Sequence, residues 1–204
     1  MTSSHPLFCI MVLAAAMAGC ASSPSAPPVL LSLPPAVAAA APVAVPAPNS
    51  APKLLAVRRV AIPEYLVARR VRYRADASTL AEWPNTFWAE RIEIGVSREF
   101  ASALRQRLPG WALCESACED RAPSLALQVE LVPLDFVRST QRLQARARVT
   151  LSSTGVPPGV LKTEEMAYDL PVGADTPQAH AQAITELIRQ VAQTVAPLVQ
   201  GARP

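Results

Sequence analysis

The sequence predicts an α+β fold: a single domain with a mostly antiparallel sheet and two helices packed on one face, preceded by a disordered Pro/Ala-rich tether. Three observations predict this architecture. Segments 125–131 and 143–151 alternate apolar and polar residues, which is typical of strands with one buried face. Segments 85–108 and 176–196 repeat apolar residues at helical spacing. Residues 21–52 carry no charge and are crowded with Pro and Ala, which is typical of a linker.

Residues 1–19 have the features of a lipoprotein signal peptide. The run from Leu7 to Gly19 contains no charge and only apolar or small residues, like the hydrophobic region of a secretory signal. Its 13 residues are too few to span a bilayer as a helix, which takes about 20. We therefore expect the protein to be exported and this segment to be removed.

Cys20 is the predicted site of lipidation. Met17, Ala18 and Gly19 precede it, and the four residues resemble the lipobox of bacterial lipoproteins, whose cysteine receives a diacylglyceryl thioether and becomes the mature N-terminus. Several acyl chains, palmitate among them, hold a protein to a bilayer far more firmly than one chain does. Ala21 stands where the inner-membrane retention signal of enteric bacteria has Asp. The resemblance therefore implies anchoring at the periplasmic face of the outer membrane.

Residues 20–52 form the predicted tether between the lipidated cysteine and the domain. Pro-rich chains favour extended polyproline II at about 3.1 Å per residue, so this segment could act as a long spacer. Residues 29–33 are a short apolar run between two prolines and are expected to form an edge strand docked on the domain. The domain itself is expected to span residues 53–200.

The first half of the domain is predicted to hold two strands and a helix. Segments 54–66 and 69–75 are rich in β-branched and alternating residues, and Pro63 should end or kink the first of them. Asn85 or Thr86 is expected to cap the helix that follows. Apolar residues recur at every fourth position of this helix, at Trp88, Ile92, Val96, Phe100, Leu104 and Leu108.

Three strands and a second helix are predicted to follow. After the alternating segments 125–131 and 143–151 comes a weaker strand at 160–170, in which Met166 and Tyr168 should face inward. The last helix is expected to be capped by Asp175 or Thr176, with Pro177 in its first turn. Its apolar seam consists of Ile184, Leu187, Ile188, Val191 and Val195. Pro197 and Gly201 are expected to end it.

Composition argues against several functional classes. A net charge of +3 without a clustered basic face makes no case for nucleic-acid binding. The sequence holds no nucleophile elbow, no H-E-x-x-H and no Gly-rich phosphate loop, so we predict neither an enzyme nor a cofactor. Metal binding is not expected, because His180 is the only histidine beyond the signal peptide.

Two smaller features allow alternatives. Cys114 and Cys118 lie four residues apart in an exported chain, where they either pair as a disulfide or remain free thiols in a polar turn. Arg142, Arg146 and Arg148 project from one face of a predicted strand. We favour a solvated sheet face for this arginine row, the alternative being contact with phospholipid headgroups or an acidic partner.

Residues 60–108 resemble part of the PqiC-like auxiliary lipoproteins of ABC-type and MCE lipid-transport systems. This stretch reads VAIPEYLVARRVRYRADASTLAEWPNTFWAERIEIGVSREFASALRQRL. The family's P-x-Y-L, strand arginine and W-A-E signals match Pro63, Tyr65, Leu66, Arg74 and Trp88 in order. The run VLLSL at residues 29–33 is similar to the family's first Y-x-L strand, without the tyrosine.

The resemblance implies a non-enzymatic outer-membrane lipoprotein. Its periplasmic domain would contact an MCE-domain protein and help phospholipid cross the periplasm, and it would form homo-oligomers. We expect Tyr65, Leu66 and Trp88 to pack the domain or its partner surface, because aromatic residues are enriched at such contacts. The alternative function is an outer-membrane assembly or cell-wall-synthase cofactor lipoprotein, which would share the anchor, the tether and a small α+β domain.

Overall fold

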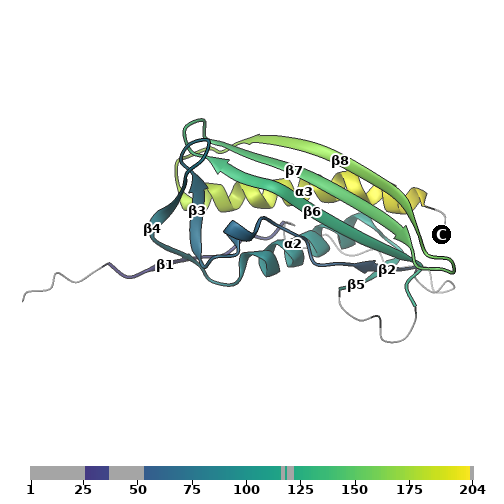
Figure 1. The fold of residues 1–204 in the computed structure, drawn as a ribbon. Helices are drawn as coiled ribbons and strands as arrows, with labels where there is room; N and C mark the ends of the chain where they lie inside the picture. Colours follow the sequence, from purple (N-terminus) through teal and green to yellow (C-terminus); the bar gives the residue numbers. More distant parts are fainter. Residues whose placement is uncertain (1–25, 37–52, 116–117, 119–121, 203–204) are drawn as a thin grey trace, which may run out of the picture.

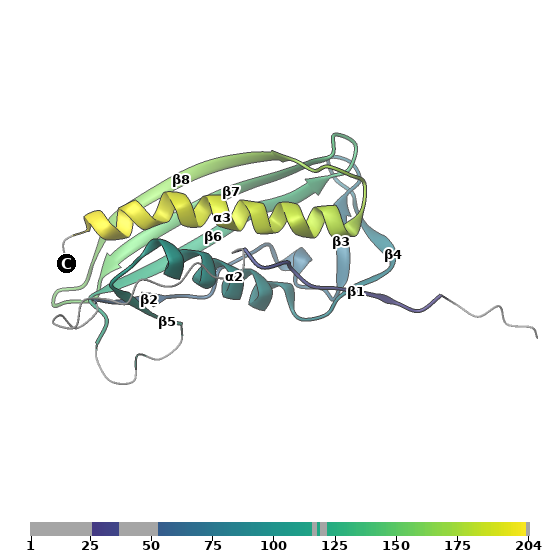
Figure 2. The same cartoon turned by 180° about the vertical axis from the view of Figure 1, so that it is seen from behind.

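The structure is a computed structural model that describes residues 26–36, 53–115, 118 and 122–202. Its elements are β1 (Val29–Leu31), β2 (Lys53–Val57), the 3-10 turn η2 (Glu64–Leu66), β3 (Arg70–Arg74), β4 (Leu80–Trp88), α2 (Ile92–Arg107), β5 (Trp111–Cys114), β6 (Leu125–Val137), β7 (Arg142–Ser153), β8 (Gly159–Pro171) and α3 (Pro177–Gly201). The strands form one sheet, and both helices lie on the same face of it (Figures 1 and 2). This confirms the predicted α+β class with two helices on one sheet face.

Strand β6 organises the sheet. One of its edges pairs with β7 along the whole strand, and β7 pairs with β8, in both cases antiparallel. Three parallel pairings share the other edge of β6. β2 pairs with its first residues, Ala61 forms an isolated bridge with Glu130, and Arg74 of β3 pairs with Val137. Beyond β3 lie β4 and then β1, and beyond β2 lies β5. The longest strand pairs are thus antiparallel, whereas the short pairs β1–β4, β2–β5 and β2–β6 are parallel.

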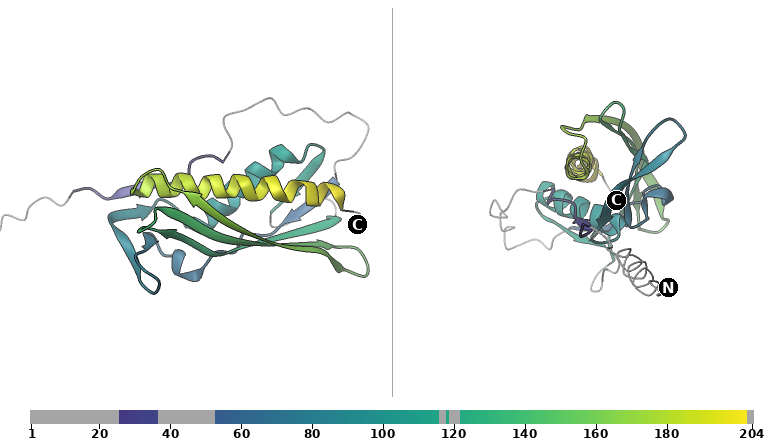
Figure 3. Two further views of the ribbon diagram at one scale, coloured as in Figure 1. Left: turned by 90° about the horizontal axis from the view of Figure 1, so that it is seen from above. Right: turned by 90° about the vertical axis from the view of Figure 1, so that its left-hand side faces the viewer.

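The core lies between the sheet and the two helices. The inward residues of β6 and β7 alternate with exposed ones, as the sequence pattern predicts. Phe100 and Leu104 of α2 and Leu187 and Val191 of α3 are at most 2% exposed. Figure 3 shows α3 running along the sheet from the β3–β4 end to the end where the C-terminus lies. Met166 and Tyr168 of β8 are partly buried against the same core.

The first helix begins later than predicted. Residues 80–88 form β4, so Asn85 and Thr86 cap no helix, and Trp88 ends a strand. Aromatic and β-branched residues favour this extended conformation. Asn85 has a φ of +49°, a left-handed conformation that Asn tolerates better than most residues. The N-cap of α2 is Arg91. The rest of the predicted apolar ladder, from Ile92 to Leu108, is buried.

The second helix starts at the predicted cap and ends at Gly201, the later of its two predicted end signals. The Thr176 hydroxyl accepts a hydrogen bond of 3.2 Å from the backbone N–H of Ala179, and Pro177 occupies the first turn. Pro197 lies inside α3, which continues to Gly201. Burial of Val199 against the core favours the last turn despite the proline.

Residues 26–36, which we call the strap, lie on the domain rather than in the tether. Leu31 and Leu33 are buried, and β1 pairs with β4 at the edge of the sheet, where the sequence suggests a strand. The apolar run is therefore part of the fold. β1 lies within the predicted edge strand at residues 29–33, and burial of Leu31 and Leu33 is favourable. The predicted signal peptide and the remaining tether residues 20–25 and 37–52 lie outside the described residues.

Candidate functional site

Two of the residues that carry the family resemblance meet in a polar network. Tyr65 lies in η2 and Arg74 at the end of β3. Asp135 of β6 joins them: the Tyr65 hydroxyl donates to its Oδ1 at 3.0 Å, and Arg74 Nε donates to its Oδ2 at 2.9 Å. A second bond of 3.2 Å from Arg74 Nη2 to Oδ1 makes the ion pair bidentate. The sequence analysis did not single out Asp135, although an aspartate within the apolar run VPLDFV is a recognisable signal.

Arg72 fixes the same turn from the neighbouring position on the sheet. Its Nη1 donates to the Tyr65 carbonyl oxygen at 2.7 Å, while Nε and Nη2 both donate to Glu82 Oε1 at 3.1 Å. The pKa of Tyr65 is raised, first by burial and then by its hydrogen bond to Asp135. Hydrogen bonding to Asp135 raises the pKa of Arg74. At neutral pH the phenol is therefore neutral, and the network holds η2 against β3 and β6.

The other motif residues pack the interior. Pro63 is buried at the start of η2, and Leu66 is partly buried against the core. Trp88 is buried and contacts the His180 ring edge-on, at 6.4 Å between centroids. Phe136 stacks on the same His180 ring, at 5.2 Å between centroids. Trp88 therefore supports the domain mainly from within, with only 4% of its surface exposed.

Cysteine positions fall into two groups. A disulfide joins Cys114 and Cys118, with 5.5 Å between their Cα atoms, at the end of β5. Cys20 and the lipobox residues Met17, Ala18 and Gly19 lie outside the described residues.

The predicted arginine row lies on the solvent face of β7. Arg146 and Arg148 are exposed, while the alternating residues Ala145, Ala147 and Val149 are buried. Two of the row pair with acidic residues of β8, Arg142 with Asp169 at 2.6 Å and Arg148 with Glu165 at 2.7 Å. The row is thus largely neutralised across the strand pair, as a solvated face would be.

The strap is held by side chains from three elements. Asn85 of β4 donates to the carbonyl oxygens of Ala26 and Pro27, at 2.7 and 3.0 Å. Near the other end, the Ala36 N–H donates to the buried Glu99 Oε2 of α2 at 2.9 Å. Thr185 of α3 donates to the Pro34 carbonyl oxygen at 3.1 Å. The strap therefore has polar contacts at both ends and apolar burial between them.

Gly95 of α2 faces both the strap and Glu90. A Cβ atom at this position would lie 3.5 Å from Leu33 Cδ1 and 3.3 Å from Glu90 Oε1. A glycine costs an exposed helix about 1 kcal/mol relative to alanine. The contact with Leu33 would be an ordinary one, whereas the contact with Glu90 would be tight and would require that side chain to shift.

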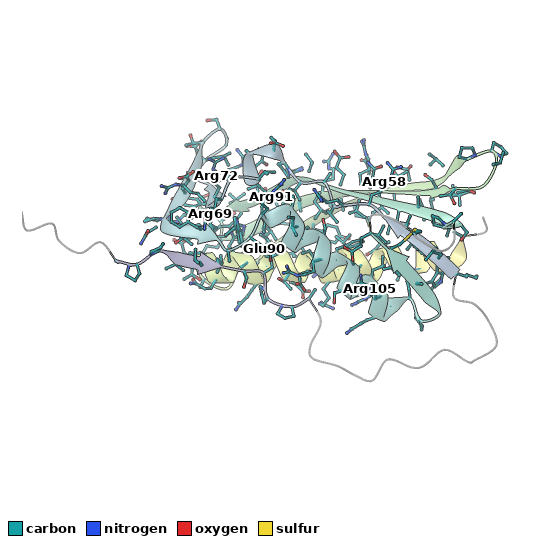
Figure 4. The ribbon with its side chains drawn as sticks, turned by 90° about the horizontal axis from the view of Figure 1, so that it is seen from below. Arg58, Arg69, Arg72, Glu90, Arg91 and Arg105 are labelled. Carbon is teal, nitrogen blue, oxygen red and sulfur yellow. A yellow bond between two sulfur atoms is a disulfide. The ribbon has the colours of Figure 1, made fainter. Side chains whose placement is uncertain are left out.

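The surface offers shallow grooves at both ends of the domain. One groove of about 260 Å³ is lined by Val67, Arg69, Trp88, Ala89, Glu90 and Arg91. Another of about 390 Å³ lies beside α2 and includes Arg58, Arg59 and Arg98. Figure 4 shows Arg69, Arg72, Glu90 and Arg91 toward the end from which β1 leaves, with Arg58 and Arg105 farther along the domain.

The opposite end carries exposed apolar side chains. Val156, in the turn between β7 and β8, is fully exposed, and Val160 and Leu161 of β8 are 66% and 42% exposed. We call these three residues the distal hairpin. A groove of about 370 Å³ beside it is lined in part by Leu161, Pro197 and Leu198. Among the described helices, none is long and apolar enough to cross a membrane.

Comparison with known proteins agrees with this fold. A crystal structure of an uncharacterized protein superposes with a TM-score of 0.66 at 16% identity, covering 85% of this chain and 99% of the other. Protein XCC0632 from Xanthomonas campestris, of the DUF330 family, gives 0.61 at 14% identity, with 84% and 91% covered. No protein with a curated description matches the sequence.

The family profile described as ABC-type transport auxiliary lipoprotein component matches residues 32–196. This range begins inside the strap and ends in α3, so it includes nearly the whole described fold. The chain belongs to the family of ABC-type transport auxiliary lipoprotein components.

Proposed function

We propose that this protein is a non-enzymatic auxiliary component of an ABC/MCE-type phospholipid transport system. In this proposal, acyl chains on Cys20 anchor it to the periplasmic face of the outer membrane, and its domain docks an MCE-domain protein. The observation that carries the proposal is the family match over residues 32–196. The lipobox-like stretch that ends at Cys20, directly before the strap, supports the anchor.

The arrangement of polar groups favours binding over catalysis. Tyr65, Arg74 and Asp135 satisfy one another, and Asp135 is only 9% exposed. Over the described ranges, no cluster of three or more His, Cys, Asp or Glu residues could hold a metal ion. The Asp135 carboxylate beside the Tyr65 hydroxyl is held through both oxygens by Arg74, and the pKa of Tyr65 is raised, first by burial, so the phenol is not activated as a nucleophile.

The distal hairpin is the surface that we assign to the MCE-domain protein. Val156, Val160 and Leu161 are apolar, exposed and adjacent to the groove beside Leu198. Exposed apolar groups of this kind are typical of a protein interface. A homo-oligomer is part of the same proposal, and light scattering of the purified mature protein would measure its size.

Lipidation is tested first. Metabolic labelling with palmitate should mark the wild-type protein and leave Cys20→Ser unlabelled, and only the wild type should sediment with outer membranes. Intact mass spectrometry of the mature protein should give an N-terminal acylated cysteine. An unmodified Met1 terminus would contradict the anchor.

Docking is tested by capture of an MCE-domain protein from the same organism. We expect Val160→Asp to lose the capture, because it places a charge in an apolar contact. Thr163→Asp, on an exposed position of the same strand, is the matched control and should keep it. Capture of a cell-wall synthase or an outer-membrane assembly factor instead would favour the alternative function.

A further inference from the structure

The docked strap sets how far the domain can stand from its anchor. The carbonyl oxygen of Ala26 is already held by Asn85 on β4. Only residues 21–25 therefore separate the lipidated cysteine from the folded domain. Fully extended, the six steps from Cys20 to Ala26 span at most about 20 Å, since a residue covers about 3.5 Å. The domain is thus tied to the membrane by a short linker, residues 21–25, that begins at one end of the molecule.

That end is opposite the distal hairpin. In Figure 1, β1 leaves the domain beside β3 and β4, whereas the C-terminus and the β7–β8 turn lie at the other end. The 25 residues of α3 run along this axis and span about 37 Å at 1.5 Å per residue. The helix is therefore longer than the linker can reach. The end at β1 must therefore stay close to the bilayer.

The surface at the β1 end combines apolar and cationic side chains. Leu30 of β1, Phe87 of β4 and Arg70 of β3 are register partners, so they stand side by side on the outer face of the sheet. Leu30 is 57% exposed and its neighbour Val29 44% exposed. The Arg70 guanidinium lies 5.1 Å from the centre of the Phe87 ring.

Further charged groups flank this row. Arg70 Nε lies 3.3 Å from Glu82 Oε2. The exposed Arg69 and Arg91 line the adjacent groove together with Glu90, as Figure 4 shows. Within the described residues, Arg69 has no carboxylate within 4 Å. Arg91 is paired with Glu93, so Arg69 is the guanidinium of this group that has no carboxylate partner among the described residues. An apolar surface beside such a guanidinium suits the boundary between acyl chains and phosphate headgroups.

We propose that this surface, formed by Leu30, Arg70 and Phe87 and flanked by Arg69, rests on the phospholipid headgroups of the leaflet that holds the anchor. We call it the membrane-facing patch. The domain then stands with β1 toward the bilayer and presents the distal hairpin to the periplasm. The inference depends on the proposed lipid anchor, and it adds an orientation and a lipid-binding surface to it.

The test is energy transfer to lipid from each end of the full lipidated protein. A fluorescent noncanonical amino acid is placed at Ala89, beside the patch, or at Val156, in the far turn; both positions are exposed. The protein is reconstituted in vesicles of phosphatidylethanolamine and phosphatidylglycerol, 3:1, that carry a headgroup-linked acceptor. We expect strong transfer from position 89 and almost none from position 156.

Variants distinguish the contribution of the membrane-facing patch from that of the short linker. Leu30→Glu with Phe87→Glu should reduce transfer from position 89, because it removes the apolar contact while the anchor remains. Val160→Glu at the far end is the matched control and should change nothing. Circular dichroism of each variant in solution shows whether it is folded, and Arg69→Ala with Arg70→Ala is a milder second variant.

The outcomes distinguish the two proposals. If the wild-type protein does not float with the vesicles, the anchor fails and this inference fails with it. If it floats but both probes transfer equally, or position 156 transfers more, only the orientation is overturned. If position 89 is shielded from a soluble quencher without transfer to lipid, the patch covers a protein, and the membrane contact is refuted.

Discussion

The buried histidine predicts how stability depends on pH. His180 is 3% exposed between Trp88 and Phe136, and burial lowers its pKa from 6.5 to about 4. Its Nδ1 has no hydrogen-bond partner in the structure. Between these two pKa values the unfolded chain binds a proton that the folded chain excludes. Stability from this residue is therefore complete above pH 6.5 and falls as the pH drops toward 4.

The size of the effect follows from the two pKa values. Each unit of pKa difference corresponds to about 1.4 kcal/mol. Integrated from pH 7 to pH 5, the proton taken up by the unfolded chain at His180 lowers the free energy of unfolding by about 2 kcal/mol. This is a large fraction of the 5–15 kcal/mol by which domains are commonly stable.

Urea denaturation, followed by tryptophan fluorescence at pH 7 and pH 5, measures this difference. The Cys20→Ser mature chain is used for it, so that the proposed lipid is absent. His180→Phe keeps an aromatic ring between Trp88 and Phe136 and should abolish the difference. Glu186→Gln is the matched control on the same helix. Its carboxylate has a pKa lowered mainly by Arg189, so it is charged at both pH values and the variant should keep the loss.

Two results would refute this reasoning. The wild type could lose less than about 0.5 kcal/mol between the two pH values, well below the expected 2 kcal/mol. Alternatively, His180→Phe could keep the full loss, in which case other groups are responsible.

Three further predictions concern the strap, the polar network and the disulfide. Leu33→Ala should lower the unfolding free energy by about 2–4 kcal/mol in urea, because it leaves a cavity under the strap, whereas the exposed Ser32→Ala should not. Tyr65→Phe should cost about 1 kcal/mol through one lost hydrogen bond, and an unchanged midpoint would argue against the network. Replacing Cys114 and Cys118 together by Ser should cost about 2 kcal/mol on the chain-entropy account, and mass spectrometry with and without reductant should show the bond directly.

Sequence patterns correctly predicted the strands in which every second side chain packs on the core. The alternation at 125–131 and 143–151 is that of β6 and β7, because one face of each strand packs on the core. Residues 80–88 misled the prediction, since Asn85 and Thr86 before an apolar run look like a helix cap. Strand β5 is only four half-buried residues long, too short for a period to show.

Sequence patterns could not predict the contacts that form the polar network and hold the strap, because these contacts join residues far apart in the chain. Tyr65 and Asp135 are 70 positions apart, and nothing in either segment indicates the other. The sequence did mark Tyr65 and Arg74 through the family resemblance, but Asp135, which joins them, carries no such mark. Likewise, Glu99 looks like a surface residue of an amphipathic helix until the strap is seen to bring the Ala36 N–H to it.

If the protein is exported and lipidated as proposed above, the last contact of the strap bears on the order of events during export. Pro34 is held by Thr185, which follows it in the chain by 151 positions. A chain that crosses the inner membrane from its N-terminus emerges with residues 26–36 first and α3 last, so these residues have no finished surface to dock on until translocation is almost complete. We therefore expect the modifying enzymes to meet Cys20 on an unfolded, freely reachable segment. Completion of the domain would then draw the lipidated end close to the folded protein.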